Sequence, residues 1–497
     1  MIREPRSALL AIALALVGAL FPLAFAPFSW WPVAPACLAV LLVAVDNRSV
    51  RASFWLAFSF GLGMFASGVG WISESFQYSN VHGPIVWILT LGFVAFLAVF
   101  PAGAMALAQR CNRMPRAAWF LLVLPAAWML VEWLRGWLLT GFTWLQLGYT
   151  QSDAAGSGLV PVIGSYGAGL LVAVSAGAVA ALVRARSRGT VLGVSVVVAV
   201  WLLGFGLQGV VWTQPVGEPL RIASVQGNYA QDIKWKRENF VPTLRRYRTL
   251  TQKALVDGAR LIVWPETAIP AFAHRVETFS AALRSDLRPF DATLLFGIPV
   301  RDDMAKVRNS VIALGNDEAV YHKRHLVPFG EYVPFAALLT PVLKAMRVPV
   351  PNFVPAEEVQ SVLRHANIRL GITICYEAAF GSEVAAELPE SNVLVNVSND
   401  AWFGDSIAPH QHLQIAQLRA LETGRPMLRS TNTGVSALIA ADGSIMATSP
   451  QFKVHVLTGS VQPMRGATPY VIVGDWPFVA SVLVVLLLAA WRSRREP

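Results

Sequence analysis

The sequence predicts a multi-span α-helical membrane domain, with about eight transmembrane helices, and a separate α/β domain. Two observations support this prediction. The 497-residue chain is 55% hydrophobic and only 14% charged, which is too apolar for an ordinary soluble protein. One block of normal polarity, residues 213–470, interrupts the apolar runs and is large enough for one α/β domain.

Eight apolar runs are candidates for transmembrane helices, and most reach the roughly 20 residues needed to cross a bilayer. The second is the weakest candidate, because Pro32 and Pro35 lie near its start. The first could be a cleaved signal peptide, but its length and the run directly after it favour a retained helix. The eight runs are about 8–28, 30–45, 53–72, 84–108, 117–139, 158–183, 189–212 and 471–491.

The net charge of +10 is concentrated in short loops and in both tails. Arginine-rich loops near 46–52, 109–116 and 184–188 alternate with loops 73–83 and 140–157, which contain no Lys or Arg. Because short basic loops stay in the cytoplasm, we expect both termini inside and the polar block outside. A charge confined to loops also argues against nucleic acid as a partner.

These observations divide the chain into three parts. We expect seven transmembrane helices in residues 1–212, an extracytoplasmic α/β domain in 213–470, and an eighth helix with a basic cytoplasmic tail in 471–497. Within the middle part, strand-like runs alternate with helical patterns at 239–256, 275–287 and 409–423, which predicts helices packed on central sheets. The expected strands are Arg221–Gln226, Leu261–Trp264, Thr293–Ile298, Ser310–Leu314, Ala319–His322, Arg369–Ile374, Val393–Val397 and Ser436–Ala440.

Three reactive side chains follow strand-like runs in this domain: Glu266, Lys323 and Cys375. Open α/β sheets commonly bind ligands at the carboxyl ends of their strands. A carboxylate, an ammonium group and a thiol can act there as general base, oxyanion stabiliser and nucleophile of an acyl transfer. Cys375 is the only cysteine of the predicted domain, so it has no internal disulfide partner.

The motifs around these residues resemble those of the nitrilase superfamily of carbon–nitrogen hydrolases, whose Glu-Lys-Cys triad has the same order. That resemblance implies an α-β-β-α sandwich for the α/β domain. Nitrilases are normally soluble, so the flanking spans narrow the resemblance to the apolipoprotein N-acyltransferase family of bacterial inner membranes. The matching motifs extend over nearly the full length: Glu132-Trp-Leu-Arg-Gly-Trp137, the stretch from Phe142 to Tyr149, Gln226-Gly-Asn228 with Trp235, Trp264-Pro-Glu266, the stretch from Lys323 to Pro334, Cys375-Tyr-Glu377 and Ser398-Asn-Asp-Ala-Trp-Phe403.

The resemblance implies that Glu266 is the general base, Lys323 the oxyanion stabiliser and Cys375 the nucleophile. The implied reaction moves a fatty acyl chain from a phospholipid, typically phosphatidylethanolamine, onto Cys375 as a thioester. A ping-pong second step then passes it to the α-amino group of the N-terminal diacylglyceryl-cysteine of an apolipoprotein. Further family positions that support the site or lie around its pocket are Glu331, Trp235, Tyr376 and Glu377.

Two other functions are compatible with parts of the sequence. A membrane-tethered amidase or nitrilase would use the same triad but resolve the acyl-enzyme with water, although one anchor would then suffice. A transporter or receptor with a nitrilase-like sensing domain would have no need of base, cation and thiol together. The acyltransferase is therefore the function that the sequence favours.

Three further features of the sequence lead to separate predictions. Glu132 and Arg135 lie three apart on one face of a predicted span, where they either pair or contact a phospholipid head group. The apolar, proline-punctuated segment 335–354 is either a packed loop or a lid that admits acyl chains. His410 and His412 with Asp405 are a weak metal pattern, and no nucleotide-binding loop is present, so we expect neither a metal nor a cofactor.

Overall fold

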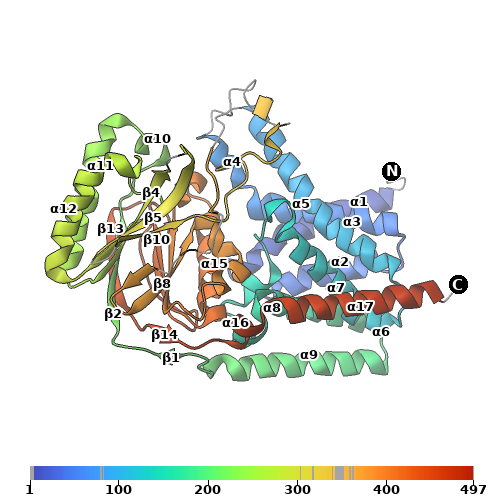
Figure 1. Ribbon diagram of the computed structural model, residues 1–497. Coiled ribbons are helices and arrows are strands. Elements are labelled where there is room, and N and C mark those ends of the chain that lie inside the picture. The colour runs from blue at the N-terminus through green and yellow to red at the C-terminus, as the bar shows by residue number, and fades with distance from the viewer. Residues whose placement is uncertain are drawn as a thin grey trace. The chain divides into compact units, whose positions relative to one another are not determined.

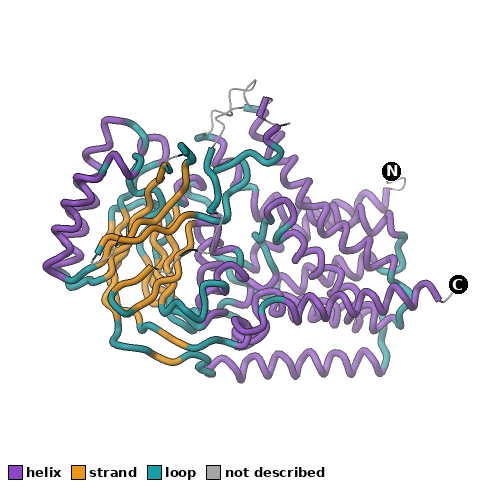
Figure 2. The backbone as a smooth tube through the Cα atoms, viewed as in Figure 1, coloured by secondary structure: helices purple, strands orange, loops and turns teal. Residues whose placement is uncertain are grey.

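The computed structural model describes residues 5–78, 81, 83–302, 304–315, 318–337, 340–341, 352–356, 360 and 363–495. The chain forms two compact units, one purely helical and one that contains the sheets (Figures 1 and 2). The first, called the membrane unit below, comprises Met1–Ser73, His82–Val210 and Ile472–Pro497. The second, the sheet unit, comprises Val211–Val471 and also Glu74–Val81, although this segment lies between two membrane-unit helices in the sequence.

Among the residues that the structure describes, seven helices of the membrane unit are long and apolar enough to cross a membrane, which confirms the multi-span prediction. The second expected span is shorter than predicted, because its helix α2 covers only Val33–Val45. Those 13 residues extend about 20 Å at 1.5 Å each, less than the roughly 30 Å of a bilayer core. The seven candidates are Ser7–Ala24, Val50–Val69, Pro84–Arg110, Arg116–Arg135, Ser157–Arg184, Arg188–Gly209 and Trp476–Arg495.

Glycines allow the first and third helices of this unit, α1 (Pro5–Leu20) and α3 (Val50–Val69), to approach closely. A Cβ on Gly18 would lie 2.0 Å from the Phe60 carbonyl oxygen, and one on Gly63 would lie 1.8 Å from that of Ala15. Neither distance is possible for real atoms, so only glycine fits. Helices without polar interfaces associate in membranes through such small residues.

Glu132 and Arg135 form an ion pair, and both also hydrogen-bond to the loop that follows their helix. Both belong to α7 (Leu124–Arg135), with 3.9 Å between the Arg135 guanidinium and the Glu132 carboxylate. Arg135 donates to the carbonyls of Phe142 and Trp144 at 2.7 and 2.6 Å, and Glu132 accepts from the backbone N–H of Leu147 at 3.1 Å. The two charges therefore hold the loop that follows α7.

The sheet unit contains two six-stranded mixed sheets with helices on their outer faces (Figure 1). In each, three central strands are parallel: β2–β3–β4 in the first sheet and β8–β9–β10 in the second. The first sheet has the order β13-β2-β3-β4-β5-β6, with bounds His455–Val461, Leu220–Gln226, Leu261–Val263, Thr293–Arg301, Val307–Leu314 and Glu318–His322. The second has the order β12-β11-β10-β9-β8-β7, with bounds Ile445–Thr448, Ala437–Ile439, Met427–Thr431, Val393–Ser398, Ile368–Ile374 and Leu363–His365.

Three apolar clusters establish the α-β-β-α layering that the resemblance to nitrilases implied. The inner cluster joins the facing sides of both sheets, with Ile222 and Val263 from one and Ile372 and Val395 from the other. A second cluster packs α11 (Arg237–Val256) and α12 (Glu277–Leu287) on the first sheet. A third packs α15 (Ala408–Thr423) on the second sheet.

All eight expected strands and all three expected helices of this unit are present, with boundaries shifted by at most three residues. The sequence missed four strands of the two sheets, which are β7, β10, β12 and β13. Of these, β10 (Met427–Thr431) is a central, fully buried strand. Arg429, Ser430 and Thr431 make it read as polar, whereas buried strands are normally continuous apolar runs. Arg429 can be buried at this position because it donates hydrogen bonds to Asp400 and Asn396.

Candidate active site

The three predicted site residues lie at the carboxyl ends of their strands in the sheet unit. Glu266 follows β3, Lys323 follows β6 and Cys375 follows β8. Lys323 is almost completely buried, with 1% of its surface exposed, and Glu266 is 8% exposed. Both act electrostatically on the Cys375 thiol, so the fold brings together three residues that are far apart in the sequence.

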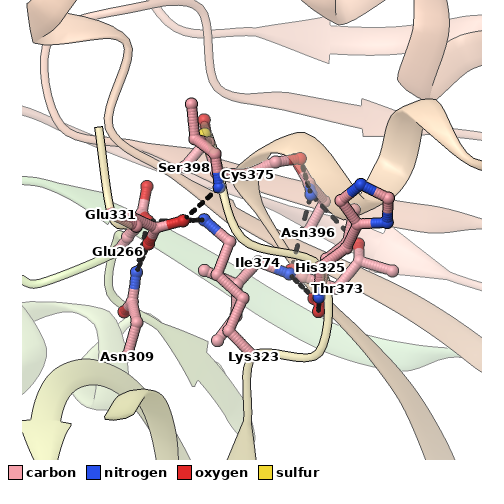
Figure 3. Close-up of polar contacts among 12 residues, drawn as sticks. Glu266, Asn309, Lys323, His325, Glu331, Thr373, Ile374, Cys375, Asn396 and Ser398 are labelled. Carbon is pink, nitrogen blue, oxygen red and sulfur yellow. Dashed lines mark hydrogen bonds and ion pairs between the residues drawn. The ribbon is translucent and has the colours of Figure 1, made fainter. Parts of the chain in front are cut away.

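A buried cluster surrounds the Lys323 ammonium (Figure 3). Its Nζ lies 2.8 Å from the Glu331 carboxylate and 3.5 Å from that of Glu266. Burial alone lowers the pKa of Lys323, but the charges of Glu331 and Glu266 outweigh it and raise that pKa above its ordinary value. Lys323 is therefore a permanent cation at neutral pH.

Asn309, which the sequence did not single out, joins the two carboxylates. Its Nδ2 donates to Glu266 Oε1 at 2.7 Å and to Glu331 Oε1 at 2.8 Å. One amide thus bridges two buried carboxylates, and the single Lys323 ammonium also contacts both. Asn309 lies within β5, where nothing in an alternating strand pattern distinguishes it from a packing residue.

We expect Asn309→Leu to slow acyl-enzyme formation about tenfold or more, because both carboxylates lose the Asn309 amide and Glu266 loses its orientation. The measurement is the rate at which Cys375 gains an acyl chain from a defined phospholipid, followed by mass spectrometry. The matched control is Asn239→Leu, which removes a side-chain amide that donates to the carbonyl of Ile233. An unchanged rate in Asn309→Leu would show that the bridge has no part in positioning the base.

Cys375 adopts an unusual backbone conformation, with φ of +53°. A non-glycine residue in this left-handed region is strained by about 1 to 2 kcal/mol, so its surroundings must hold it there. The residue is partly exposed. Burial of the thiol and the nearby Glu266 raise the Cys375 pKa well above its usual range, and Lys323 offsets part of that increase. The resting thiol is therefore protonated at neutral pH and requires a base.

Glu377 connects the Cys375 turn to the loop after Lys323. One carboxylate oxygen accepts from the backbone N–H of Ile374 at 2.6 Å and from the Tyr321 hydroxyl at 3.0 Å. The other accepts from the N–H groups of Arg324 at 2.6 Å and His325 at 3.2 Å. Burial raises the pKa of Glu377 to about 7, although these donors and Lys323 oppose the increase.

The other predicted site residues lie at different distances from this centre. Tyr376 is buried with its ring against Phe380. Trp235 is 54% exposed just after the short helix α10 (Gln231–Lys234), whose Lys234 donates to the Glu266 main-chain carbonyl at 3.4 Å. Glu132 and Arg135 belong to the membrane unit.

Two expectations concern the surroundings of the site. Most of the proposed lid, 335–354, lies outside the described residues, but just past its end the N–H of Ala356 donates to the Lys323 carbonyl at 2.9 Å. His412 contacts Asp400 rather than Asp405. Within the part of the chain that the structure describes, no group of three or more His, Cys, Asp or Glu residues could hold a metal.

Comparison with known proteins gives the family. Residues 17–178 match the apolipoprotein N-acyltransferase N-terminal domain, and residues 221–470 match the carbon–nitrogen hydrolase family. The apolipoprotein N-acyltransferase of Methylococcus capsulatus is 43% identical over 492 residues, which cover 98% of this chain and 97% of that relative. This chain belongs to the apolipoprotein N-acyltransferase family.

A second relative agrees with this family membership. The apolipoprotein N-acyltransferase of Chromobacterium violaceum is 40% identical, over 99% of this chain and 96% of that relative. Among solved structures, a Nesterenkonia amidase of the nitrilase superfamily is 17% identical, covering 53% of this chain and 97% of its own, with a TM-score of 0.40. The chain is therefore an acyltransferase with a carbon–nitrogen hydrolase domain in its sheet unit.

Proposed function

We propose that this enzyme transfers a fatty acyl chain from a phospholipid to the α-amino group of the N-terminal diacylglyceryl-cysteine of apolipoproteins. The observation that carries the proposal is the partly exposed Cys375 thiol on a strained backbone. The charges of Glu266 and Lys323 both affect the pKa of this thiol. Phosphatidylethanolamine is the proposed donor, and the helices of the membrane unit keep the enzyme where that donor resides. The acceptor is the diacylated apolipoprotein.

In the proposed first half-reaction, Glu266 removes the proton of the Cys375 thiol, and the thiolate attacks the carbonyl carbon of a phospholipid ester. The Lys323 ammonium stabilises the oxyanion of the tetrahedral intermediate. A carbon–sulfur bond forms, the carbon–oxygen ester bond breaks, and Glu266 returns the proton to the departing lysophospholipid oxygen. The chain remains on Cys375 as a thioester.

In the proposed second half-reaction, the neutral α-amino group of the lipoprotein attacks the thioester carbonyl carbon. A carbon–nitrogen bond forms and the carbon–sulfur bond breaks. Glu266 takes the extra proton of the amine and passes it to the Cys375 thiolate, which regenerates the resting enzyme. A thioester preserves the activation of the acyl group until the amine arrives, so two bulky lipids can use one site in turn.

We also propose that the enzyme is a multi-pass protein of the bacterial inner membrane, with both termini in the cytoplasm and the sheet unit in the periplasm. This topology needs an even number of crossings, so the short helix α2 must cross together with the seven longer helices. The support is the distribution of charge. The arginine-rich loops near 46–52, 109–116 and 184–188 and the basic tail all lie on one side if the helices alternate in direction. Exported lipoproteins present their diacylated N-terminus on the other side.

The decisive experiment incubates the purified enzyme with one defined phospholipid and analyses the Cys375 peptide by mass spectrometry. We expect an acyl adduct that hydroxylamine removes and that is absent from Cys375→Ala. Addition of a diacylated lipopeptide should then transfer the chain to its amine. Release of free fatty acid in its place would identify a hydrolase, and a missing or Cys375-independent adduct would refute the thioester mechanism.

A further inference from the structure

A closed set of buried hydrogen bonds, called the polar ring below, lies beneath Cys375. His412 Nε2 lies 3.1 Å from the Cys375 main-chain oxygen and His412 Nδ1 lies 3.0 Å from Asp400 Oδ1. Arg429 donates to Asp400 Oδ2 at 2.8 Å and also to Asn396 Oδ1. Asn396 Nδ2 lies 3.4 Å from the Cys375 oxygen and closes the circuit. All four side chains are at most 1% exposed.

The hydrogen-bond partners of His412 in the polar ring determine how many protons its imidazole carries. A main-chain carbonyl can only accept a hydrogen bond. Asp400 is an acceptor too, because Arg429 and His412 outweigh its burial and hold its pKa well below the usual range. Both imidazole nitrogens therefore face acceptors, and both contacts form together only if each nitrogen carries a proton.

Burial and the Arg429 guanidinium lower the pKa of His412 below its ordinary value, even though Asp400 and the Cys375 carbonyl oppose the lowering. The case for the imidazolium therefore rests on its two acceptor contacts and not on this pKa. A neutral imidazole would turn one of its two contacts into acceptor against acceptor. With a charged imidazole, two cations and one carboxylate leave the ring with one positive charge. That charge would offset the effect of the Asp400 carboxylate, which by itself raises the pKa of the Cys375 thiol.

The ring also accounts for the strained backbone of Cys375. Glu377 holds the N–H of Ile374 just before Cys375, and the ring holds the carbonyl of Cys375 itself. These two anchors flank the strained φ angle of +53°. The ring reaches the thiol as well, because Ser398 donates to Asp400 at 2.9 Å and its side chain also interacts with the Cys375 thiol.

We propose that His412, as an imidazolium paired with Asp400, is a positioning residue that holds the Cys375 carbonyl and thereby aims the thiol. The inference rests on the proposed function in one respect, since it takes Cys375 as the nucleophile. It concerns the reactivity of the thiol itself, however, so it can be tested without any lipid substrate.

Three substitutions separate the two contacts of His412. In His412→Gln, the side-chain amide reaches the position of Nε2 and can still donate to the Cys375 carbonyl. In His412→Asn, the amide reaches the position of Nδ1 and can donate only to Asp400, and His412→Leu removes both contacts. His410→Gln, two residues earlier in α15 and half-buried, is the matched control.

The readout is the rate at which iodoacetamide alkylates Cys375 in the full-length enzyme without lipid, measured on the Cys375 peptide by mass spectrometry. We expect His412→Leu and His412→Asn to lose about tenfold or more of that rate, and His412→Gln to retain most of it. Equal rates in all variants, or a rate in His412→Asn that matches or exceeds that in His412→Gln, would overturn the proposal. The proposal would also be overturned if the loss of alkylation rate in each variant simply paralleled its loss of melting temperature.

A second measurement needs no stable variant. Nitrogen-15 spectra of the wild-type enzyme labelled at histidine report whether each ring nitrogen carries a proton, and the loss of one signal set in His412→Gln assigns His412. We expect two protonated nitrogens at pH 7, and one unprotonated nitrogen would refute the imidazolium. Neither measurement depends on acyl transfer. A failed phospholipid experiment with a confirmed ring would therefore refute only the proposed function.

Discussion

Replacing Lys323 by methionine should abolish measurable acyl transfer and destabilise the sheet unit. The substitution leaves Glu266 and Glu331 buried without their shared cation, with one Asn309 amide between them. Breaking a buried ion pair in this way typically costs about 3 to 5 kcal/mol. One carboxyl group will then take up a proton, and the oxyanion loses its donor, for which we expect a loss of about 100- to 1,000-fold in the acylation rate.

A double variant separates the two effects. Adding Glu331→Gln to Lys323→Met removes one of the two unpaired carboxylates and so restores the net charge of the original cluster. It should recover much of the free energy of unfolding but none of the acylation rate. Thermal unfolding and the rate of adduct formation on Cys375 are the two measurements. Lys253→Met, on the exposed side of α11, controls for the loss of a lysine. Near-normal acylation in Lys323→Met would contradict the assigned role.

Replacing Glu377 by glutamine should have the second largest effect, although the two side chains have nearly the same shape. Four donors point at the two oxygens of Glu377, two at each. A glutamine keeps one oxygen and turns an NH2 group towards the other two donors. Two unsatisfied buried donors at about 1 to 3 kcal/mol each give roughly 2 to 6 kcal/mol of destabilisation. The link between the Lys323 loop and the Cys375 turn is lost with them.

The pH dependence of stability gives an independent check on Glu377. Its folded-state pKa is raised from 4.5 to about 7, mainly by burial. The folded protein therefore binds this proton more tightly than the unfolded chain does. Its contribution to the free energy of unfolding declines as pH rises from about 4.5 to 7, and this decline should be missing from Glu377→Gln. Glu277→Gln, exposed at the start of α12, should keep it.

The sequence by itself determined those features that depend on local pattern. Long apolar runs specify helices, because only a helix satisfies its own backbone hydrogen bonds in lipid. Apolar runs that end in Glu266, Lys323 and Cys375 placed these residues at strand ends, where the structure has them. The prolines near the start of α2 marked it as the weakest candidate span, but its length was still overestimated from the sequence.

Only the tertiary structure decided which distant side chains meet. Asn309 bridges two carboxylates from within an ordinary strand, and its role depends on what lies opposite it. His412 stands near Asp405 in the sequence but contacts Asp400, because α15 packs on the sheet that carries Cys375. Arg429 made β10 unrecognisable as a buried strand, since the acceptors that neutralise its charge come from elsewhere in the chain. Local pattern reports backbone periodicity and hydrophobicity, whereas polar networks form between residues that are adjacent only after folding.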